Sequence, residues 1–505
     1  MTFNLATHFV DRLPCTRTAL VCGDEEVTYA ELSVLVNRAG NVLRELGVRS
    51  GQRVLLALND SVEFVAVWYA AQKIGAVTAE VYSFLQAKDY AYYLNYTEAA
   101  VVIADSSTLP ALREAGARNL LVVGDGPLEP GEHSFAVLTA SASAELEAAP
   151  TELDDVAIWK FTTGSTGSPK ACVHPARSSL ESFERYALGV LDLREDDRVL
   201  AVPKLFFGYA RDLTALFPFG VGASGIVFPQ RSTADLLFSL IERYRPTILV
   251  NVPTMMSAMI ADPSASTVDM SSLRLATSAG EALPSELHRK WDKLFGVPVI
   301  DGIGSSEAYH IYLSNVPGAQ RVGSLGREVP GYTARVLDES GETLPDGEIG
   351  TLEVTGPTIA REYYGDAEKT ARTFHGDTLR TGDLFSRDTD GYFHHHGRAD
   401  DLLKVSGVFV APSEIEDCLI GHPAVVDCAV VGVSIDGLVV PRACVVLAEG
   451  AEVTPDELKD HARAHLAKHK YPREVVFVTE LPRTANGKLD RRTLRKRETG
   501  RRETA

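Results

Sequence analysis

The sequence predicts an α/β protein with a large N-terminal domain and a small α+β C-terminal domain. Two observations lead to this prediction. The chain has 505 residues, more than one hydrophobic core usually supports, so two or more domains are expected. Short β-rich runs are followed by loops and helical patterns along most of its length, as in α/β folds. No repeat of fixed period is visible.

Strands of the large domain are predicted where short aliphatic runs end in Gly- or Ser-rich turns, the usual ligand-binding position of open α/β sheets. These runs are Ala99–Ala104, Asn119–Val123, Ile248–Val252, Leu273–Thr277 and Val297–Ile300. A helix is predicted over Pro284–Phe295, because proline suits the first turn of a helix.

The domain boundary is predicted near Gly397–Asp401, which divides the chain into residues 1–397 and 398–505. About a hundred residues are enough for a small α+β domain. Within it, Ala424–Gly432 and Arg442–Leu447 are predicted strands, joined through a loop that contains Gly437.

A helix of the small domain is predicted from Thr454 to about His469. Thr454 and Glu457 form a capping-box pattern, and a proline occupies the first helical position. Leu458, Ala462 and Leu466 fall on one face of this helix.

Composition limits the partners and the compartment. A formal charge of −18 argues against nucleic-acid binding, which needs a clustered basic surface. No stretch approaches the roughly 20 apolar residues that span a bilayer, and Met1–Asp11 lacks the pattern of a signal peptide. The six cysteines show no C-x-x-C pair and no zinc-type spacing, which favours a reduced, cytoplasmic setting. The basic segment Arg491–Ala505 is interpreted as a solvated helix end or tail.

The segment Thr162-Thr163-Gly164-Ser165-Thr166-Gly167-Ser168-Pro169-Lys170 is the sharpest functional signal. Glycines let the backbone approach a polyanion, hydroxyls donate hydrogen bonds, and the lysine supplies positive charge. Lys170 follows proline and precedes no Ser or Thr, so this is not a Walker A loop. A phosphate-binding loop is therefore predicted, although an ordinary polar surface loop has a similar composition.

This loop resembles the signature of the adenylate-forming superfamily, which comprises acyl-CoA synthetases, luciferases and the adenylation domains of peptide synthetases. Further motifs follow in the order of that family, over nearly the whole chain. Ala171 and Leu379 are departures, since the family usually has glycine and many relatives have tyrosine there. The further motifs are Ser278–Glu281, Asp301–Glu307, Arg380–Asp383, Gly397–Asp401, Lys404–Gly407 and Pro482–Lys488.

The resemblance implies a large adenylation domain that binds ATP and a small mobile domain. Ser306 resembles the hydroxyl that contacts phosphate, and Glu307 the carboxylate that holds Mg²⁺, a cation that prefers oxygen ligands. Asp383 resembles the acceptor of both ribose hydroxyls, with Arg398 near the ribose and phosphates. The full predicted ATP site is Thr162, Thr163, Gly164, Ser165, Thr166, Gly167, Lys170, Ser278, Ala279, Gly280, Glu281, Asp301, Gly302, Ile303, Ser306, Asp383 and Arg398.

The resemblance also assigns roles to the small domain. Lys488 resembles the lysine of the adenylation step, and Asp400 the hinge about which the small domain turns. Lys404 and Gly407 belong to the loop that enters the active site for the second, thioester-forming step. Lys488, Glu307, Lys404 and Gly407 are the predicted catalytic residues, and Glu307 the predicted metal ligand.

The acid-binding segment resembles that of the benzoate–CoA ligases, in both Lys204–Ala210 and Ala308–Ile311. An aromatic carboxylic acid and CoA are therefore the expected substrates beside ATP. Benzoate, hydroxybenzoates and aminobenzoates all stay open, because His310 could bond to a ring substituent or simply form the pocket wall. The predicted lining residues are Phe206, Tyr209, Ala210, Ala279, Gly302, Ile303, His310 and Ile311.

Two alternatives remain at this point. A stand-alone enzyme that loads a carrier protein would share the same ATP motifs. A catalytically silent binding module on the same scaffold would not need all of the charged groups that are present here. No nucleic-acid or membrane partner is expected, and a homodimer is one possible assembly.

Overall fold

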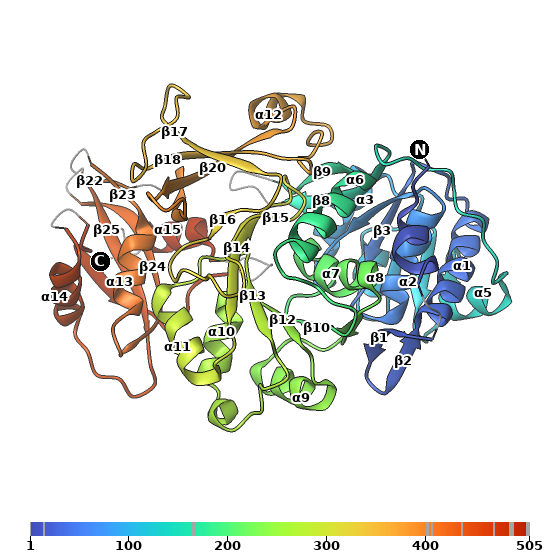
Figure 1. The fold of residues 1–505 in the computed structure, drawn as a ribbon, viewed down its shortest axis with the longest axis horizontal. Coiled ribbons are helices and arrows are strands. Elements are labelled where there is room, and N and C mark those ends of the chain that lie inside the picture. The colour runs from blue at the N-terminus through green and yellow to red at the C-terminus, as the bar shows by residue number, and fades with distance from the viewer. Residues whose placement is uncertain are drawn as a thin grey trace.

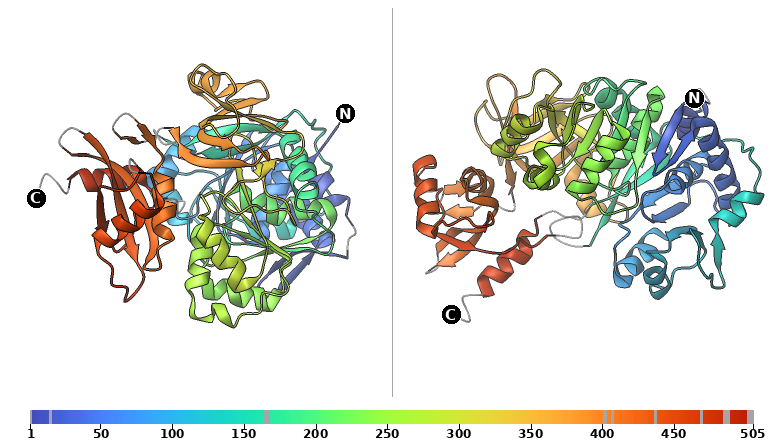
Figure 2. Two further views of the ribbon diagram at one scale, coloured as in Figure 1. Left: turned by 60° about the vertical axis from the view of Figure 1, so that its left-hand side comes forward. Right: turned by 90° about the horizontal axis from the view of Figure 1, so that it is seen from below.

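The computed structural model describes residues 2–13, 16–162, 168–399, 403–405, 408–435, 438–467, 470–483 and 489–500. It is an α/β structure with a large N-terminal domain and a small C-terminal domain, as predicted. The small domain, orange to red, forms a separate lobe beside the large one (Figures 1 and 2).

A seven-stranded sheet fills the N-terminal part of the large domain, in the order β7-β6-β5-β3-β4-β8-β9. Its neighbouring strands are parallel except β8 and β9, which form an antiparallel hairpin. Parallel strands need crossover connections, which the helices supply. The strands are β3 (Arg53–Ala57), β4 (Val77–Glu80), β5 (Val101–Asp105), β6 (Leu120–Val123), β7 (Glu132–Ser134), β8 (Val156–Thr162) and β9 (Lys170–Pro175). The helices are α1 (Tyr29–Glu45), α2 (Val62–Lys73), α3 (Ala87–Thr97), α4 (Leu109–Glu114), α5 (Phe135–Ser141) and α6 (Ala176–Ser182).

A nine-stranded sheet forms the second half of the large domain, in the order β16-β15-β14-β13-β12-β10-β11-β1-β2. The central strands from β14 to β1 are parallel, and both edges are antiparallel. The strands are β1 (Thr18–Cys22), β2 (Glu25–Thr28), β10 (Arg198–Ala201), β11 (Ser224–Val227), β12 (Ile248–Asn251), β13 (Leu275–Ser278), β14 (Val299–Gly304), β15 (Ile311–Ser314) and β16 (Arg327–Glu328). The helices are α7 (Gly208–Ala215), α8 (Phe217–Val221), α9 (Ala234–Tyr244), α10 (Pro253–Ala261) and α11 (Ser285–Phe295).

An antiparallel five-stranded sheet follows, at the top of Figure 1. Its strands β20 and β21 form a hairpin that ends the large domain next to the nine-stranded sheet. The elements are β17 (Thr333–Leu337), β18 (Gly350–Thr355), α12 (Ala367–Thr373), β19 (Phe374–His375), β20 (Thr378–Arg387) and β21 (Phe393–Arg398).

The small domain has a two-stranded hairpin, β22–β23, and a three-stranded sheet, β24-β25-β26. Its elements are β22 (Leu403–Val405), β23 (Val408–Val410), α13 (Pro412–Ile420), β24 (Val425–Ile435), β25 (Leu438–Leu447), α14 (Pro455–His465), β26 (Glu474–Phe477) and α15 (Arg491–Gly500). The core beneath α13 and α14 includes Ile415, Val430 and Leu458, while Leu494 of α15 packs on the opposite side with Ala429 and Cys444.

The largest hydrophobic core lies between the two large sheets and is shared by both. A second core lies under α9–α11 and a third under α3 and α4, so each large sheet is covered on two faces. The carboxyl ends of the parallel strands are thereby fixed where the sheets meet. This arrangement provides a rigid frame for ligand-binding loops.

The five predicted strands of the large domain are confirmed, with ends shifted by at most four residues. Pro284 is the N-cap of α11 and not its first helical residue. The capping box of α14 is confirmed, but the helix ends at His465, because Leu466 already has an extended backbone. The loop that contains Gly437 lies outside the described residues.

The interpretation of the basic C-terminal segment as merely solvated is wrong for its first part. Arg491 of α15 donates two hydrogen bonds to the Glu416 carboxylate, at 2.6 and 2.7 Å. Leu494 and Glu498 are buried, and Glu498 pairs with Arg442. Buried apolar and paired charged residues on one face therefore attach this helix to the small domain.

The expectations about the cysteines and about membrane-spanning segments concern the described part of the chain. Cysteines 22, 172, 418, 428 and 444 are free thiols there. No helix in that part combines the length and apolar character needed to cross a membrane.

Candidate active site

Three of the charged residues predicted for the nucleotide and its metal ion act on one buried tyrosine. Tyr312 on β15 is fully buried, and its hydroxyl has no hydrogen-bond partner. Burial raises its pKa most, the charges of Asp383 and Glu307 raise it further, and Arg398 lowers it. Residues from three separate motifs therefore act electrostatically on one phenol, where the nine-stranded sheet meets the β20–β21 hairpin.

The hairpin positions Asp383 opposite Arg398 in its register. Arg398 Nη1 donates to Asp383 Oδ1 at 3.1 Å and to the carbonyl oxygen of Thr381 at 3.4 Å. Gly382, between Thr381 and Asp383, has φ +72°, a backbone conformation that favours glycine. Because Asp383 is more buried than Arg398, the hairpin presents an exposed guanidinium above a fixed carboxylate.

Glu307 lies in the loop between β14 and β15. The hydroxyl of Tyr363 donates to Glu307 Oε1 at 2.7 Å, and burial and the Glu307 charge raise the pKa of that tyrosine. Oε1 therefore has a fixed neutral donor, and this leaves Oε2 as the oxygen for another ligand. The neighbouring Ser306 hydroxyl donates to the carbonyl oxygen of Phe161 on β8, at 3.1 Å.

The predicted phosphate loop connects the two strands of the β8–β9 hairpin. Thr162 and Lys170 are paired in the register at its base, while residues 163–167 lie outside the described part of the chain. The Lys170 ammonium forms an ion pair with Asp366, which also caps α12. This cation is thus held by a carboxylate at the side of the loop.

Two neighbouring strands carry buried polar side chains. Ser278 ends β13, and its register partner Asp301 lies on β14. Ser278 Oγ and Asp301 Oδ1 are both buried and lack a hydrogen bond of good geometry among the described residues, although the Ser278 hydroxyl and the Gly302 N–H lie near enough to lower the pKa of Asp301 against the effect of burial. Burial raises the pKa of Asp301 to about 8, so that its neutral acid form predominates at pH 7. A neutral carboxyl group can donate as well as accept a hydrogen bond.

Glu281 has a local structural partner. Its carboxylate accepts hydrogen bonds from the backbone N–H and hydroxyl of Thr254, at 3.0 and 2.6 Å, in the first turn of α10. Gly280 before it has φ +88° and open space beside it. From the small domain, Arg483 donates to the hydroxyl of the same Thr254 at 3.1 Å. Thr254 therefore links the start of the predicted lysine motif to Glu281 of the predicted adenine segment.

An aromatic enclosure surrounds His310. The ring centroids of Tyr186, Tyr209 and Phe217 lie 5.2, 5.7 and 4.9 Å from that of His310. Both ring nitrogens of His310 are buried without a hydrogen-bond partner, and burial lowers its pKa to about 3. The imidazole is therefore neutral at pH 7.

The other predicted lining residues divide between two places. Phe206 packs in a second aromatic cluster, with Tyr82, Phe84 and Phe207. Tyr209 donates to, or accepts from, the Thr277 hydroxyl at 2.6 Å, which connects α7 to β13. The remaining predicted lining residues are Ala210, Ala279, Gly302, Ile303 and Ile311. Ala210 lies in the first turn of α7, and the others lie on or next to β13, β14 and β15. All except Gly302 belong to the large hydrophobic core or pack against it.

A buried network of charges joins the elements around the site. Lys160 Nζ on β8 donates to Asp212 Oδ2 and to the carbonyl oxygen of Tyr309, both at 2.7 Å. Arg211 donates to Glu80 at 2.5 Å and to Asp212 at 2.6 Å. Burial lowers the pKa of Lys160 to about 8, and Asp212 opposes this effect. The two cations and two carboxylates balance each other inside the large domain.

This network fixes an unusual backbone conformation. Tyr309 has φ +68°, which costs a residue with a side chain about 1 kcal/mol or more. Its hydroxyl lies 2.8 Å from Ser179 Oγ, and the Lys160 ammonium lies 3.5 Å from its ring centroid. Since Tyr309 connects Glu307 to His310, the network determines where both side chains point.

Gly208 at the start of α7 makes room for the same lysine. A Cβ atom at this position would lie 2.7 Å from Lys160 Nζ and 2.8 Å from its Cε. These separations are shorter than any ordinary contact, and both hydrogen bonds of the ammonium hold it there. The close approach of helix and lysine therefore requires glycine.

Three residues predicted for the small domain lie outside the described residues: Lys488, Gly407 and Asp400, the predicted hinge. Lys404 lies on β22. Arg483 and Leu489, on either side of residues 484–488, form an isolated antiparallel bridge.

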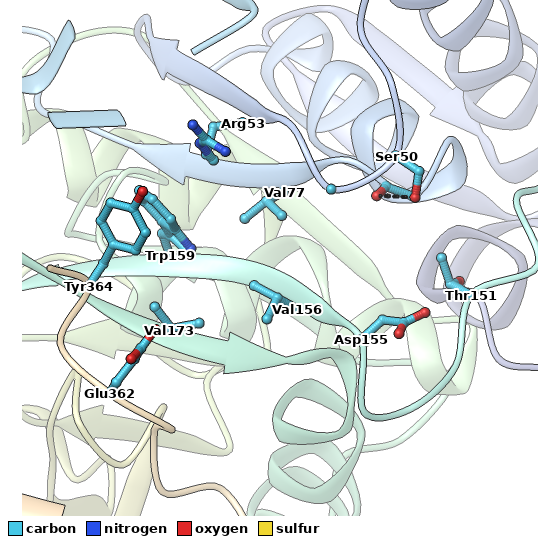
Figure 3. A pocket seen from close by; sticks show the side chains of 12 residues that line it. Ser50, Arg53, Val77, Thr151, Asp155, Val156, Trp159, Val173, Glu362 and Tyr364 are labelled. Atoms are coloured by element: carbon cyan, nitrogen blue, oxygen red, sulfur yellow. Dashed lines mark hydrogen bonds between the residues drawn. The ribbon is translucent and has the colours of Figure 1, made fainter. Parts of the chain in front are cut away.

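A separate cavity of about 380 Å³ opens at the seven-stranded sheet (Figure 3). It is lined by residues of β3, β4, β8 and β9 and by the segment before α12, including Arg53, Trp159 and Tyr364. Among the described residues, none of those predicted for ATP or the acid lines it. The cavity is thus distinct from the candidate active site.

Sequence reasoning did not identify several residues that shape the site. Tyr312 and Tyr363 come from outside the family motifs, and Tyr186 and Phe217 reach His310 only through tertiary packing. Lys160 could have been noticed in the sequence, because it is a lone lysine in the apolar run of β8, two residues before the phosphate loop.

Two family profiles match the chain, one in each domain. The profile described as AMP-binding enzyme matches residues 7–364, and the profile of the AMP-binding enzyme C-terminal domain matches residues 414–488. The chain belongs to the AMP-binding enzyme family. The predicted resemblance to the adenylate-forming superfamily is thereby confirmed.

Curated members of the AMP-binding enzyme family are similar over nearly their whole length. A benzoate–CoA ligase of Thauera aromatica is 41% identical, over 93% of this chain and 90% of the relative. A 4-hydroxybenzoate–CoA/benzoate–CoA ligase of Rhodopseudomonas palustris is 37% identical, over 98% of this chain and 94% of the relative.

Solved structures of AMP-binding enzymes have the same fold. An anthranilate CoA ligase in complex with anthranoyl-AMP aligns with a TM-score of 0.95 at 38% identity, covering 98% of this chain and 97% of the other. A benzoate CoA ligase from Burkholderia xenovorans aligns with a TM-score of 0.91 at 37% identity, covering 98% and 100%.

Proposed function

We propose that this AMP-binding enzyme is an ATP-dependent, AMP-forming aryl acid–CoA ligase. The observation that carries the proposal is the Asp383–Arg398 pair of the β20–β21 hairpin, which together with Glu307 acts on Tyr312, two residues from His310 in the aromatic enclosure. The similar ligases named for benzoate, hydroxybenzoate and anthranilate support the same class of substrate. ATP and CoA are the co-substrates that this class requires.

The reaction has two steps. A carboxylate oxygen of the aryl acid attacks the α-phosphorus of ATP, which forms an aryl-adenylate and releases pyrophosphate. The CoA thiol then loses its proton and attacks the acyl carbon, and the bond between the acyl carbon and the phosphate oxygen breaks to release AMP. Positioning and charge neutralisation around phosphorus provide most of the catalysis in such transfers.

The nucleotide is held by groups on three elements. Asp383 accepts both ribose hydroxyls, and Arg398 next to it lies close to the ribose and phosphates. Ser306 and the phosphate loop from Thr162 to Lys170 bind phosphate oxygens, while Ser278–Glu281 and Asp301–Ile303 border the adenine. This assignment follows the motif positions, and Lys488 is the proposed lysine of the first step.

Mg²⁺ fits the oxygen donors of Glu307. The free Oε2 next to a fixed Oε1 is the hard, partly exposed carboxylate oxygen that this cation takes beside phosphate and water. When bound, the ion supplies positive charge at the phosphate oxygens. Glu307 holds it in position, and Tyr363 keeps the carboxylate oriented.

The acid-binding residues favour a ring with a polar substituent. Neutral His310 lies among aromatic rings. Its two ring nitrogens, Ser278 Oγ and one oxygen of Asp301, Oδ1, are buried and lack a hydrogen bond of good geometry within the described part of the chain. The charge of Asp301 acts on both Tyr186 and Tyr209, so Asp301 lies near the same enclosure. Buried polar groups without partners cost about 1–3 kcal/mol each, which a hydroxyl or amino group of the substrate would recover. We therefore propose hydroxybenzoate or aminobenzoate as the preferred substrate.

The test is an assay of the purified chain with ATP, Mg²⁺, CoA and a panel of benzoates. Formation of aryl-CoA and AMP in equal amounts is expected, with kcat/KM for a hydroxy- or aminobenzoate at least about tenfold above that for benzoate. Asp383→Asn is the control for the nucleotide site, for which a raised KM for ATP is expected.

Two results would contradict parts of the proposal. If no acid supported exchange of pyrophosphate into ATP, the adenylation chemistry itself would be wrong. If adenylates formed but only a carrier protein accepted the acyl group, the choice of CoA would be wrong. A clear preference for unsubstituted benzoate would overturn only the assignment of the polar substituent.

A further inference from the structure

A group of possible metal ligands lies on the small domain. Cys418 on α13 and His461 and His465 on α14 each offer one ligand atom, and these atoms lie within 4.8 Å of one another. Cys418 and His461 are partly buried, and His465 is exposed. None of the proposed substrate contacts involves these residues, so the group is independent of the proposed function.

The fold brings the three side chains together. His461 and His465 are four residues apart on α14, so they lie on the same face of the helix, and their ring centroids are 4.5 Å apart. Helix α13 packs beside α14 in the small domain and adds the thiol. Two histidines at this helical spacing are a recurrent metal-binding pair.

Backbone hydrogen bonds fix the tautomer of both imidazoles. His461 Nε2 lies 3.1 Å from the carbonyl oxygen of Cys418, and His465 Nδ1 lies 2.8 Å from the carbonyl oxygen of His461. A carbonyl oxygen only accepts, so each of these nitrogens carries the hydrogen. Nδ1 of His461 and Nε2 of His465 then keep their lone pairs. Metal-binding histidines typically make this kind of outer hydrogen bond.

We propose that Cys418, His461 and His465 bind a zinc-class divalent cation, with water in a fourth position. One sulfur and two nitrogen ligands suit Zn²⁺ or Co²⁺ and do not suit Mg²⁺ or Ca²⁺, which prefer oxygen. On binding, the S–H bond of Cys418 breaks, a sulfur–metal bond forms, and the proton passes to solvent. The cation then links α13 to α14.

The ligand spacing is compatible with this coordination. Bond lengths of about 2.0 Å to nitrogen and 2.3 Å to sulfur imply ligand separations of about 3.5 Å in a tetrahedral site. The atoms need to approach by about an ångström from the observed limit of 4.8 Å. His465 is exposed and can adjust its side chain without disturbing the core. His422, whose ring centroid lies 5.2 Å from that of His461, is the nearest further candidate for the fourth position.

The test uses the full chain without an affinity tag, stripped by chelator and titrated with ZnCl₂ or CoCl₂ in the absence of ATP. We expect one equivalent to bind and the cobalt form to show a thiolate charge-transfer band. Cys418→Ser should abolish the band, and both Cys418→Ser and His465→Ala should weaken Zn²⁺ binding by about 10–100-fold or more, since even outer-shell changes cost that much.

Cys22→Ser and His375→Ala are matched controls, because each removes a cysteine or histidine of the large domain. Both should bind zinc like the unchanged chain. His465 is exposed, so His465→Ala should fold like the unchanged chain, and circular dichroism checks this. Failure of the unchanged chain to bind stoichiometric Zn²⁺, or equal binding by Cys418→Ser and His465→Ala, would overturn the proposal. The outcome is independent of any ligase activity.

Discussion

Replacing Lys160 with methionine should destabilise the large domain strongly. The substitution keeps most of the aliphatic side chain and removes only the ammonium, which donates to Asp212 and to the Tyr309 carbonyl at 2.7 Å. The side chains of Lys160 and Asp212 are 6% and 0% exposed, so water cannot replace the lost partner. Removing one member of a buried pair typically costs about 3–5 kcal/mol, which we expect for the free energy of unfolding.

Urea unfolding followed by tryptophan fluorescence measures this loss. The three tryptophans, Trp68, Trp159 and Trp291, are all buried in the large domain, so the signal reports on that domain alone. Arg245→Met is the matched control. It removes one cation from the Arg245–Asp269 pair, whose side chains are 44% and 56% exposed, and should cost about 0–1 kcal/mol.

A loss below about 1 kcal/mol in Lys160→Met, equal to that of the surface control, would refute the reasoning. It would mean that Arg211 alone neutralises Asp212. The double variant Lys160→Met/Asp212→Asn gives a further check. If the pair is coupled as described, the second substitution should restore part of the lost stability, because it removes the buried charge left without its partner.

Three further outcomes follow from the site. Asp383→Asn should raise KM for ATP by about 10–100-fold, since a hydrogen bond to a charged group contributes about 1.5–3 kcal/mol. Steady-state kinetics measures this KM, and an unchanged value would exclude the contact between Asp383 and the ribose. Tyr363→Phe removes the donor to Glu307 and should raise the Mg²⁺ concentration needed for half-maximal rate by about tenfold; equal Mg²⁺ dependence would contradict the orienting role. Asp301 has a pKa raised from 3.8 to about 8, so the folded state keeps a proton that the unfolded state has lost, and stability falls as pH rises across this interval. In Asp301→Asn that part of the pH dependence should disappear in urea unfolding between pH 5 and 8, and its persistence would assign it to another group.

Sequence alone predicted the strands and motifs that depend on local pattern. The capping box at Thr454 and the parallel strands β12 to β14 have this origin, because alternation of short apolar runs with turns determines them. The pairing of Asp383 with Arg398 was not predicted, because it depends on the register of the β20–β21 hairpin.

Sequence could not predict contacts that form only after tertiary packing. The enclosure of His310 combines residues of four elements, and the network of Lys160 joins β4, β8 and α7 across long sequence separations. The role of Glu281 was expected at the nucleotide, while its carboxylate accepts from Thr254 in the first turn of α10. The three proposed zinc ligands escaped detection for the same reason, since Cys418 and the histidine pair come from different helices.

The contact between Gly208 and Lys160 links two positions that lie 48 residues apart in the chain. A methyl group at 208 would displace the ammonium from its two acceptors, whereas a shorter neutral residue at 160 would make that methyl group harmless. The effect of a substitution at either position on stability therefore depends on which residue occupies the other. Any redesign of the helix that begins at Gly208 must therefore change positions 160 and 208 together.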